Sequence, residues 1–301
     1  MFNRGWCKTG AFSGFSSGLV SVSIEAMRAQ IRHITEYSYP ILATDSFNQL
    51  RLQPAHDDFQ SLLSFRLSLA PDVAVTANKD YFGTTVHHFH IREAHQRLKI
   101  ETNSVVVKHP KPFPNSAPAS SLTAYKADYF EFLSSCKRVP LNSDWVALLE
   151  YRPIKPEDDL LEYLMGLNSH LKTRFLFQAG VTMVNTPLLE FVQHGTGVCQ
   201  DFVHAMLAVC RSQGIPARYV SGYVYAGTDF LGAEATHAWL EAFIPSVGWI
   251  GFDPTNNLLE TENHIRIGFG RDYDDIPPLH GLRRGGGLET LDVSVTIQAQ
   301  Q

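Results

Sequence analysis

Apolar and polar side chains alternate along much of the segment 27–107, and this alternation predicts β-strands. Residues 65–69 read Phe-Arg-Leu-Ser-Leu, and residues 98–103 read Leu-Lys-Ile-Glu-Thr-Asn. A period of two with one polar face is typical of half-buried antiparallel strands. Turn-forming residues at 71–72 and 78–80 separate these strands. We therefore expect an antiparallel β-sandwich at the N-terminal end of the chain.

Helical spacing of apolar residues becomes clear only in the second half of the chain. Thr186 followed by Pro187 is typical of an N-cap and a first helical position. The residues that follow Cys199 are apolar almost all round, which indicates a buried helix, and Gly214 and Pro216 are suited to close it. The sequence thus predicts helices over 158–171, 187–191 and from 199 to Gly214, and strands over 217–225, 236–244, 249–253 and 290–298.

Composition along the chain divides it into four parts. Residues 1–26 are rich in glycine and serine, and we expect a disordered tail there, ahead of a start at Met27. The predicted β-sandwich spans 27–108. Four prolines among serines and alanines make 109–122 a linker. Residues 123–301 would form a second domain of mixed helices and strands, ending in a C-terminal strand, so the expected fold class is α+β.

The overall composition excludes several classes of protein. Of the 301 residues, 44% are hydrophobic and 18% are charged, which is enough apolar material for real cores. The net charge of -5, without a basic stripe, gives no reason to expect nucleic acid or a membrane as partner. Four cysteines are too few for a disulfide scaffold. We expect a soluble protein in the cytoplasm.

Cys199 lies where a cysteine can act as a nucleophile. It follows the segment Gly-Thr-Gly at 195–197 and opens the buried helix. Unpaired N–H groups and the helix dipole at that end stabilise an anion, which favours the thiolate. Cys210, in the middle of the same helix, instead fits an inert buried cysteine. The two lie roughly 16 Å apart along the helix, too far for a disulfide.

A nucleophilic cysteine needs a base and a group that orients the base. His237 shares one face of its predicted strand with Trp239 and Glu241. The next strand ends in Asp253, and the turn at 245–248 should pair the two strands as a hairpin. Asp253 could then hold a ring nitrogen of His237, whereas Asp201 would point away from the thiol. Cys199, His237 and Asp253 are the candidate catalytic residues.

This assignment requires a particular strand register. His237 and Asp253 meet only if they project from the same face, and a slip of one residue turns a whole strand over. Pairing Ile244 with Trp249 would put Asp253 behind the sheet. Pairing Phe243 with Trp249 puts it diagonal to His237. We therefore predict a loop of odd length between the strands, or a β-bulge that compensates for an even one.

The motifs around the three candidates resemble those of a known family. Segments 197–204 (Gly-Val-Cys-Gln-Asp-Phe-Val-His), 236–239 (Thr-His-Ala-Trp) and 251–255 (Gly-Phe-Asp-Pro-Thr) are similar to the three core motifs of the bacterial transglutaminase-like cysteine proteases. The resemblance extends over 27–107 and over 270–287. It implies a papain-like core behind a β-rich region, with Cys199 as nucleophile, His237 as general base and Asp253 as its orienting partner.

The resemblance implies acyl transfer at an amide carbonyl of a peptide or protein, including the side chain of glutamine. If water releases the acyl group, the enzyme is a cysteine peptidase or amidase, and if an amine releases it, a transglutaminase. The shared triad leaves this choice open. The alternative class is a non-catalytic peptide-binding protein with the same fold.

Two other clusters of polar residues suggest metal chemistry less strongly. His88 and His90 would share a strand face beside His87, but no cysteine or carboxylate at ligand spacing completes a zinc site. Asp272, Asp274 and Asp275 resemble part of a calcium loop, without its glycine and its terminal glutamate. We expect solvated strand histidines, and neither a metal nor an organic cofactor.

Overall fold

The computed structural model describes residues 26–111, 114–141, 146–225, 230–232 and 235–300. All but the last residue of the predicted tail 1–26 lies outside this range. The first strand begins at Met27, where the alternation of the sequence begins. In the described part of the chain, no helix is long and apolar enough to cross a membrane.

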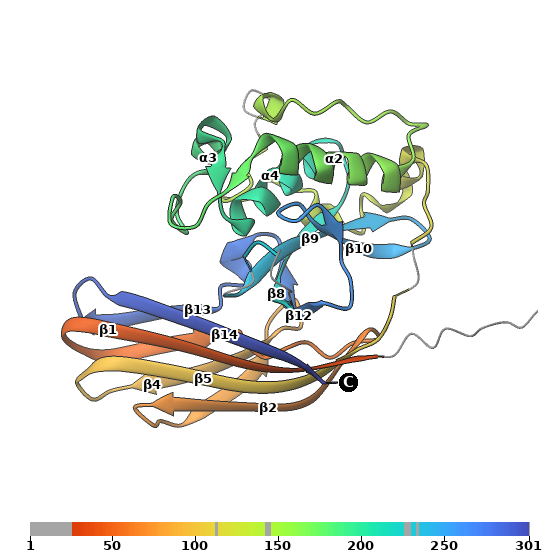
Figure 1. The fold of residues 1–301 in the computed structure, drawn as a ribbon. Coiled ribbons are helices and arrows are strands. Elements are labelled where there is room, and N and C mark those ends of the chain that lie inside the picture. Colours follow the sequence, from red (N-terminus) through yellow and green to blue (C-terminus); the bar gives the residue numbers. More distant parts are fainter. Residues whose placement is uncertain (1–25, 112–113, 142–145, 226–229, 233–234, 301) are drawn as a thin grey trace, which may run out of the picture.

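A seven-stranded antiparallel sheet forms the lower part of the molecule in Figure 1. Its strands run in the order β2-β5-β1-β4-β3, and β13 and β14 also pair with β1. The first half of β1 pairs with β5 and β14, and its second half pairs with β4 and β13, so the sheet curls on itself. The seven strands are β1 (Met27–Leu50), β2 (Gln60–Ala70), β3 (Val75–Lys79), β4 (Thr85–Ile91), β5 (His95–Lys108), β13 (Leu279–Gly285) and β14 (Thr290–Gln300).

The C-terminal strand predicted over 290–298 forms, but its partner lies at the other end of the chain. β14 pairs with residues 28–38 of β1 along its whole length. The curled sheet therefore contains both the first and the last described strands. Its core also includes Tyr223, Ile265 and Ile267, which come from the second sheet. The two sheets thus share a packed interface.

The second sheet is five-stranded, in the order β11-β10-β9-β8-β12, and α4 covers one of its faces (Figure 1). The strands are β8 (Ala217–Val224), β9 (His237–Ile244), β10 (Gly248–Asp253), β11 (Leu258–Leu259) and β12 (His264–Gly270). The helices are α2 (Leu160–Arg174), α3 (Leu188–His194) and α4 (Cys199–Ser212). The short elements are β6 (Leu176–Phe177), β7 (Thr196–Gly197), η1 (Ala119–Tyr125), η2 (Phe130–Phe132), η3 (Ala147–Leu149) and η4 (Tyr273–Asp275).

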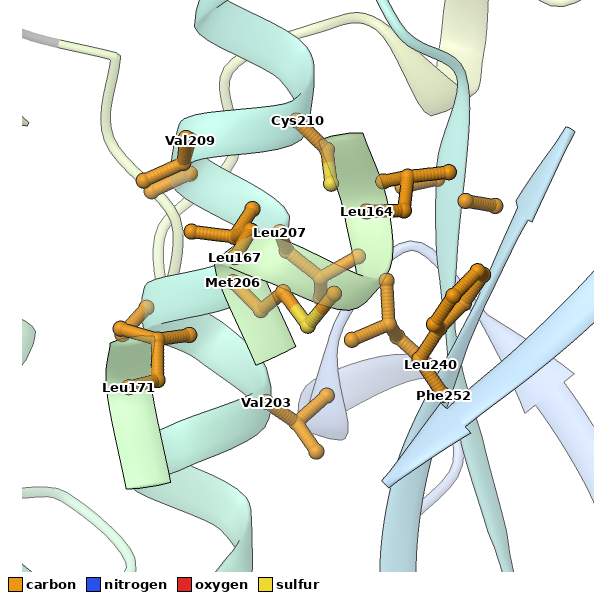
Figure 2. Packing of buried hydrophobic residues seen from close by; sticks show 14 of the residues in the cluster. Leu164, Leu167, Leu171, Val203, Met206, Leu207, Val209, Cys210, Leu240 and Phe252 are labelled. Atoms are coloured by element: carbon orange, nitrogen blue, oxygen red, sulfur yellow. The ribbon is translucent and has the colours of Figure 1, made fainter. Parts of the chain in front are cut away.

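The helix α4 is buried almost all round, as its composition predicted. Figure 2 shows Met206 and Leu207 of α4 between the leucines of α2 and the side chains of Leu240 and Phe252. All of these side chains are fully buried. Burying one such side chain contributes about 1.5–3 kcal/mol to folding, so this contact holds the middle of α4 against the sheet.

The helix α3 differs at its start from the prediction. It begins at Leu188, with Pro187 rather than Thr186 as the N-cap. The hydroxyl of Thr186 accepts a hydrogen bond from the backbone N–H of Met183 at 2.8 Å, so it is engaged in the preceding turn and does not cap the helix. The helix continues to His194, beyond the predicted end at Phe191, and Gly195 follows it with a φ of 75° that suits a glycine.

The second half of the predicted linker 109–122 packs against the start of α2. The backbone carbonyl of Ala117 accepts a hydrogen bond from the N–H of Leu160 at 3.0 Å, and the N–H of Ala119 donates to the backbone carbonyl of Asp158 at 2.9 Å. Leu122, in η1, is buried in the core around α4. The chain thus joins the core of the second sheet before residue 123.

Candidate active site

Cys199 is the first residue of α4, and its surroundings are fixed by the residues on either side. Asp201 accepts hydrogen bonds from the N–H of Val198 at 2.9 Å and from the hydroxyl of Thr182 at 2.7 Å. It therefore holds the turn at the helix start. Gly197 is required here, because an added Cβ would lie 2.6 Å from Asp201 Oδ2.

The hairpin of β9 and β10 has the register that the triad requires. Phe243 pairs with Trp249, and the inner pair Ile244 and Gly248 leaves a three-residue loop over 245–247, so the prediction of an odd-length loop is confirmed. In this register Asp253 falls opposite Trp239 and diagonal to His237. The Nε2 atom of His237 lies 2.9 Å from Oδ2 of Asp253, and both side chains are fully buried. Strand alternation has thus brought the predicted pair into hydrogen-bond contact.

The electrostatics of this pair favour its charged form. Burial opposes the positive charge of His237, but the Asp253 carboxylate and then the Cys199 thiol outweigh burial and raise the pKa of His237. Burial likewise opposes the charge of Asp253, but His237 and then His264 hold the pKa of Asp253 well below its usual range. His237 is thus suited to take up a proton while Asp253 stays ionised.

The remaining ring nitrogen of His237 is the one available to the thiol. With Nε2 bonded to Asp253, Nδ1 is buried and has no hydrogen-bond partner among the described residues. Cys199 is close enough to contribute to the pKa of His237. A side chain at position 232 would crowd this approach, because a Cβ added to Gly232 would lie 3.1 Å from Nδ1. The structure therefore brings Cys199, His237 and Asp253 together.

The comparisons with known proteins agree with this geometry. Residues 151–254 match the Transglutaminase-like superfamily, and residues 29–107 match the Bacterial transglutaminase-like N-terminal region. The chain is 33% identical over 277 residues to an uncharacterized protein of Mycobacterium leprae, covering 90% of this chain and 98% of that one. The chain belongs to the transglutaminase-like superfamily. Cys199, His237 and Asp253 all lie within the matched core.

Two further similarities concern the core and the fold. A segment of 66 residues is 41% identical to the "Protein-glutamine gamma-glutamyltransferase" of Pseudomonas aeruginosa, covering 20% of this chain and 10% of that protein. A crystal structure described as a "Putative Cysteine Protease from Cytophaga hutchinsonii" superposes with a TM-score of 0.76 at 20% identity, over 92% of both chains. The predicted fold class is confirmed: α+β, with N-terminal antiparallel β-structure before a papain-like, transglutaminase-like core. Where a β-sandwich was expected, the strands form the single curled sheet of seven strands, which also includes β13 and β14.

Two tyrosines lie near enough to Cys199 for its charge to act on them in this transglutaminase-like core. The rings of Tyr219 and Tyr273 lie edge to face, with centroids 6.3 Å apart. Burial raises the pKa of both, and the neighbouring Cys199 contributes to each shift. Trp239, by contrast, is fully buried beside His237. The ring of Trp239 stacks on the imidazole of His237, with centroids 6.4 Å apart.

Sequence reasoning missed two residues that contact the triad carboxylate. Asn256 donates from its side chain to Oδ2 of Asp253 at 2.8 Å, and Nε2 of His264 lies 3.5 Å from the same oxygen. Asn256 follows directly after the motif at 251–255, and an inspection of that turn could have found it. His264 lies on another strand, and no local pattern in the sequence points to it.

The clusters considered for metals have other contacts. Nε2 of His88 lies 2.6 Å from the side-chain oxygen of Asn78, and Asp275 forms an ion pair with Arg271 at 2.8 Å. Oδ1 of Asp272 accepts the N–H of Asp274 at 2.9 Å, which stabilises the turn before η4. Among the described residues, no group of three or more histidines, cysteines or carboxylates could hold a metal ion.

Proposed function

We propose that this protein catalyses acyl transfer at the amide carbonyl of a peptide or protein, through a thioester on Cys199. The observation that carries the proposal is the 2.9 Å hydrogen bond between Asp253 and Nε2 of buried His237, which leaves Nδ1 for the thiol at the start of α4. A nucleophile, a base and a group that orients the base form the constellation that such chemistry needs.

The reaction begins with a proton transfer. The thiol proton of Cys199 passes to Nδ1 of His237, and the sulfur attacks the carbonyl carbon while the C=O electron pair moves to the oxygen. The N–H groups of Asp201 and Phe202 are bonded to the carbonyl of Val198. The N–H groups of Cys199 and Gln200 come before them at the start of α4, where no helical carbonyl precedes them, and can stabilise this oxyanion. His237 then donates its proton to the leaving amine as the C–N bond breaks, and a thioester remains on Cys199.

The second half of the reaction decides the class of enzyme. His237 removes a proton from water or from a second amine, which attacks the thioester and frees the thiol. Water gives a peptidase or amidase, and a primary amine gives a transglutaminase, for which glutamine side chains would be the acyl donors. The names of the Pseudomonas aeruginosa and Cytophaga hutchinsonii proteins cover both outcomes. Hydrolysis and transfer to an amine would both use Cys199, His237 and Asp253 in the roles given above. The cytoplasm remains the proposed location of the protein.

The proposal is tested with a library of glutamine-containing peptides, incubated with and without methylamine and analysed by mass spectrometry. Peptide cleavage or deamidation would identify a hydrolase, and methylamine incorporation a transferase. Cys199→Ala should abolish every product, and the matched variant Cys210→Ala should retain them. Products that persist in Cys199→Ala would refute the proposal, and so would peptide binding by the wild type with no product at all.

A further inference from the structure

The Asp253 carboxylate is held by more donors than its partner His237 alone. It is fully buried, and its Oδ1 accepts hydrogen bonds from the backbone N–H groups of Thr255 at 3.0 Å and Asn256 at 3.2 Å. Its Oδ2 lies 2.9 Å from His237, 2.8 Å from the Asn256 side chain and 3.5 Å from Nε2 of His264. Both oxygens are thus bonded, as the burial of a charge requires.

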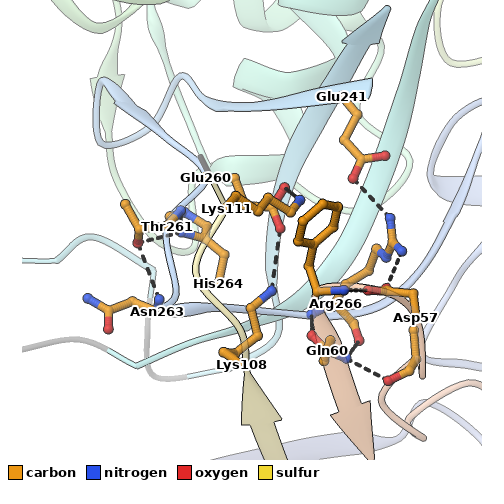
Figure 3. Close-up of polar contacts among 12 residues, drawn as sticks. Asp57, Gln60, Lys108, Lys111, Glu241, Glu260, Thr261, Asn263, His264 and Arg266 are labelled. Atoms are coloured by element: carbon orange, nitrogen blue, oxygen red, sulfur yellow. Dashed lines mark hydrogen bonds and ion pairs between the residues drawn. The ribbon is translucent and has the colours of Figure 1, made fainter. Parts of the chain in front are cut away.

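The protonation of His264 follows from its other ring nitrogen. The backbone N–H of Thr261 lies 3.1 Å from Nδ1 of His264 (Figure 3). A backbone N–H can only donate, so Nδ1 must accept and carries no proton. The single proton of the neutral ring is therefore on Nε2, the nitrogen that faces Asp253. The backbone N–H of His264 donates to the backbone carbonyl of Thr261 at 3.1 Å, which fixes this turn.

The ring of His264 is also held by aromatic neighbours. Trp239 lies edge to face with it, at a centroid distance of 5.2 Å, and Phe230 does the same at 5.9 Å. The side chain of His264 is fully buried. Rotation of the imidazole away from Asp253 would require these rings to move, because buried side chains are close-packed.

Besides Asp253, Glu260 is a second buried carboxylate near His264. The pKa of Glu260 is lowered, against burial, by Lys111 and then Lys108. Lys111 lies 2.8 Å and Lys108 3.5 Å from the Glu260 carboxylate. Figure 3 shows both ammonium groups directed at Glu260. Glu260 thus has cations of its own, and Asp253 is the carboxylate to which Nε2 of His264 is bonded.

We propose that His264 is a positioning residue for the reaction at Cys199, a neutral imidazole that donates from Nε2 to Asp253 and so keeps Oδ2 directed at His237. This inference rests on the proposed function. Because His264 carries no charge, it adds a donor without placing a second cation beside the imidazolium of His237. Loss of this donor would let the carboxylate rotate and would weaken the orientation of the base.

The proposal is tested with the full chain by comparing two variants of His264. His264→Gln keeps an amide N–H near the position of Nε2, and His264→Leu removes the donor. The measurement is the rate at which iodoacetamide alkylates Cys199 at about pH 7, which reports the thiolate that the base maintains. Each rate is taken at a temperature below the unfolding transition of both variants.

We expect alkylation to slow by about tenfold or more in His264→Leu, since a hydrogen bond to a charged group is lost, and to stay within about threefold of wild type in His264→Gln. Equal rates in wild type and His264→Leu would overturn the proposal, and so would equal losses in both variants. If Cys199 of the wild type reacts no faster than Cys210, the proposed function itself fails.

A second measurement needs no variant to fold. In ¹⁵N NMR spectra of the wild-type protein at about pH 6–8, His264 should show a protonated Nε2 and an unprotonated Nδ1. A proton on Nδ1, or a doubly protonated ring, would contradict the proposed donor. This result does not depend on whether Cys199 is reactive, so it separates a failure of the His264 proposal from a failure of the proposed function.

Discussion

Replacing Asp253 by asparagine should test the triad with almost no change of shape. The carboxylate accepts hydrogen bonds only, whereas an amide offers one acceptor oxygen and one NH₂ donor. The backbone N–H groups of Thr255 and Asn256 cannot reverse, so the amide oxygen must stay in the place of Oδ1. The NH₂ group then occupies the place of Oδ2, 2.9 Å from Nε2 of His237. His237 would have to accept from it.

This reversal moves the proton of neutral His237 from Nε2 to Nδ1, the nitrogen that must take the thiol proton. A carboxylate-to-amide change with the same effect on tautomer lowers kcat about 10⁴-fold in the serine protease triad. We expect product formation by Asp253→Asn to fall by about 10³ to 10⁴-fold, because the requirement on the base is the same. The change also places the amide NH₂ against the donors of Asn256 and His264, which should cost about 1–3 kcal/mol of stability.

The assay is the formation of peptide products by wild type and variant, with folding checked by thermal denaturation. The matched control is Asp80→Asn, because the Asp80 carboxylate accepts the N–H groups of Phe82 and Thr84 in a turn of the other sheet. The control should retain wild-type rates. If folded Asp253→Asn kept activity within about tenfold of wild type, the orienting role of Asp253 would be wrong.

Four further outcomes are expected. Iodoacetamide should label Cys199 first in rate, because burial raises the pKa of Cys136 to about 11 and of Cys210 to about 12; mass spectrometry of early time points checks this. A chain that starts at Met27 should keep the melting temperature of the full chain, since the first strand begins there. Gly197→Ala should lose about 1–3 kcal/mol in urea unfolding, because its Cβ would meet Asp201 and Phe191 at 2.6 Å. The free energy of unfolding, measured as a function of pH, should decrease as the pH is lowered from about 4, the ordinary pKa of an aspartate. Below that pH the unfolded chain binds a proton at Asp253 that the folded protein does not, because the pKa of Asp253 is lowered by folding.

The hairpin that carries the triad could be predicted because its constraints are local. Only a few residues separate β9 from β10, and side chains alternate strictly along both strands. The chemical requirement that His237 and Asp253 share a face therefore leaves few registers. The same holds for α4, where a composition that is apolar almost all round demands burial without reference to any distant segment.

His264 could not be predicted in this way, because its position depends on a non-local pairing. β12 pairs with β8, about forty residues earlier in the chain, and the register shifts between Arg266 and Gly268. A bulge of this kind changes which residues share a face, so alternation along β12 does not determine which residues lie beside the triad. The partner of β14 is likewise at the other end of the chain, where no short-range pattern could indicate it.

The same strand also connects the N-terminal sheet to the active site. The side-chain amide of Gln60 in β2 forms two hydrogen bonds with the backbone of Arg266. Its oxygen accepts the N–H of Arg266 at 2.8 Å, and its nitrogen donates to the carbonyl of Arg266 at 2.8 Å. Gln60 thus clamps β12 two residues beyond His264 (Figure 3). The guanidinium of Arg266 binds Asp57 on one side and Glu241 of β9 on the other. β12 is therefore held between the curled sheet and the strand that carries His237. Because buried ion pairs and amide clamps of this kind are costly to break, these contacts help to hold β12, and with it His264, in place relative to the strand that carries His237.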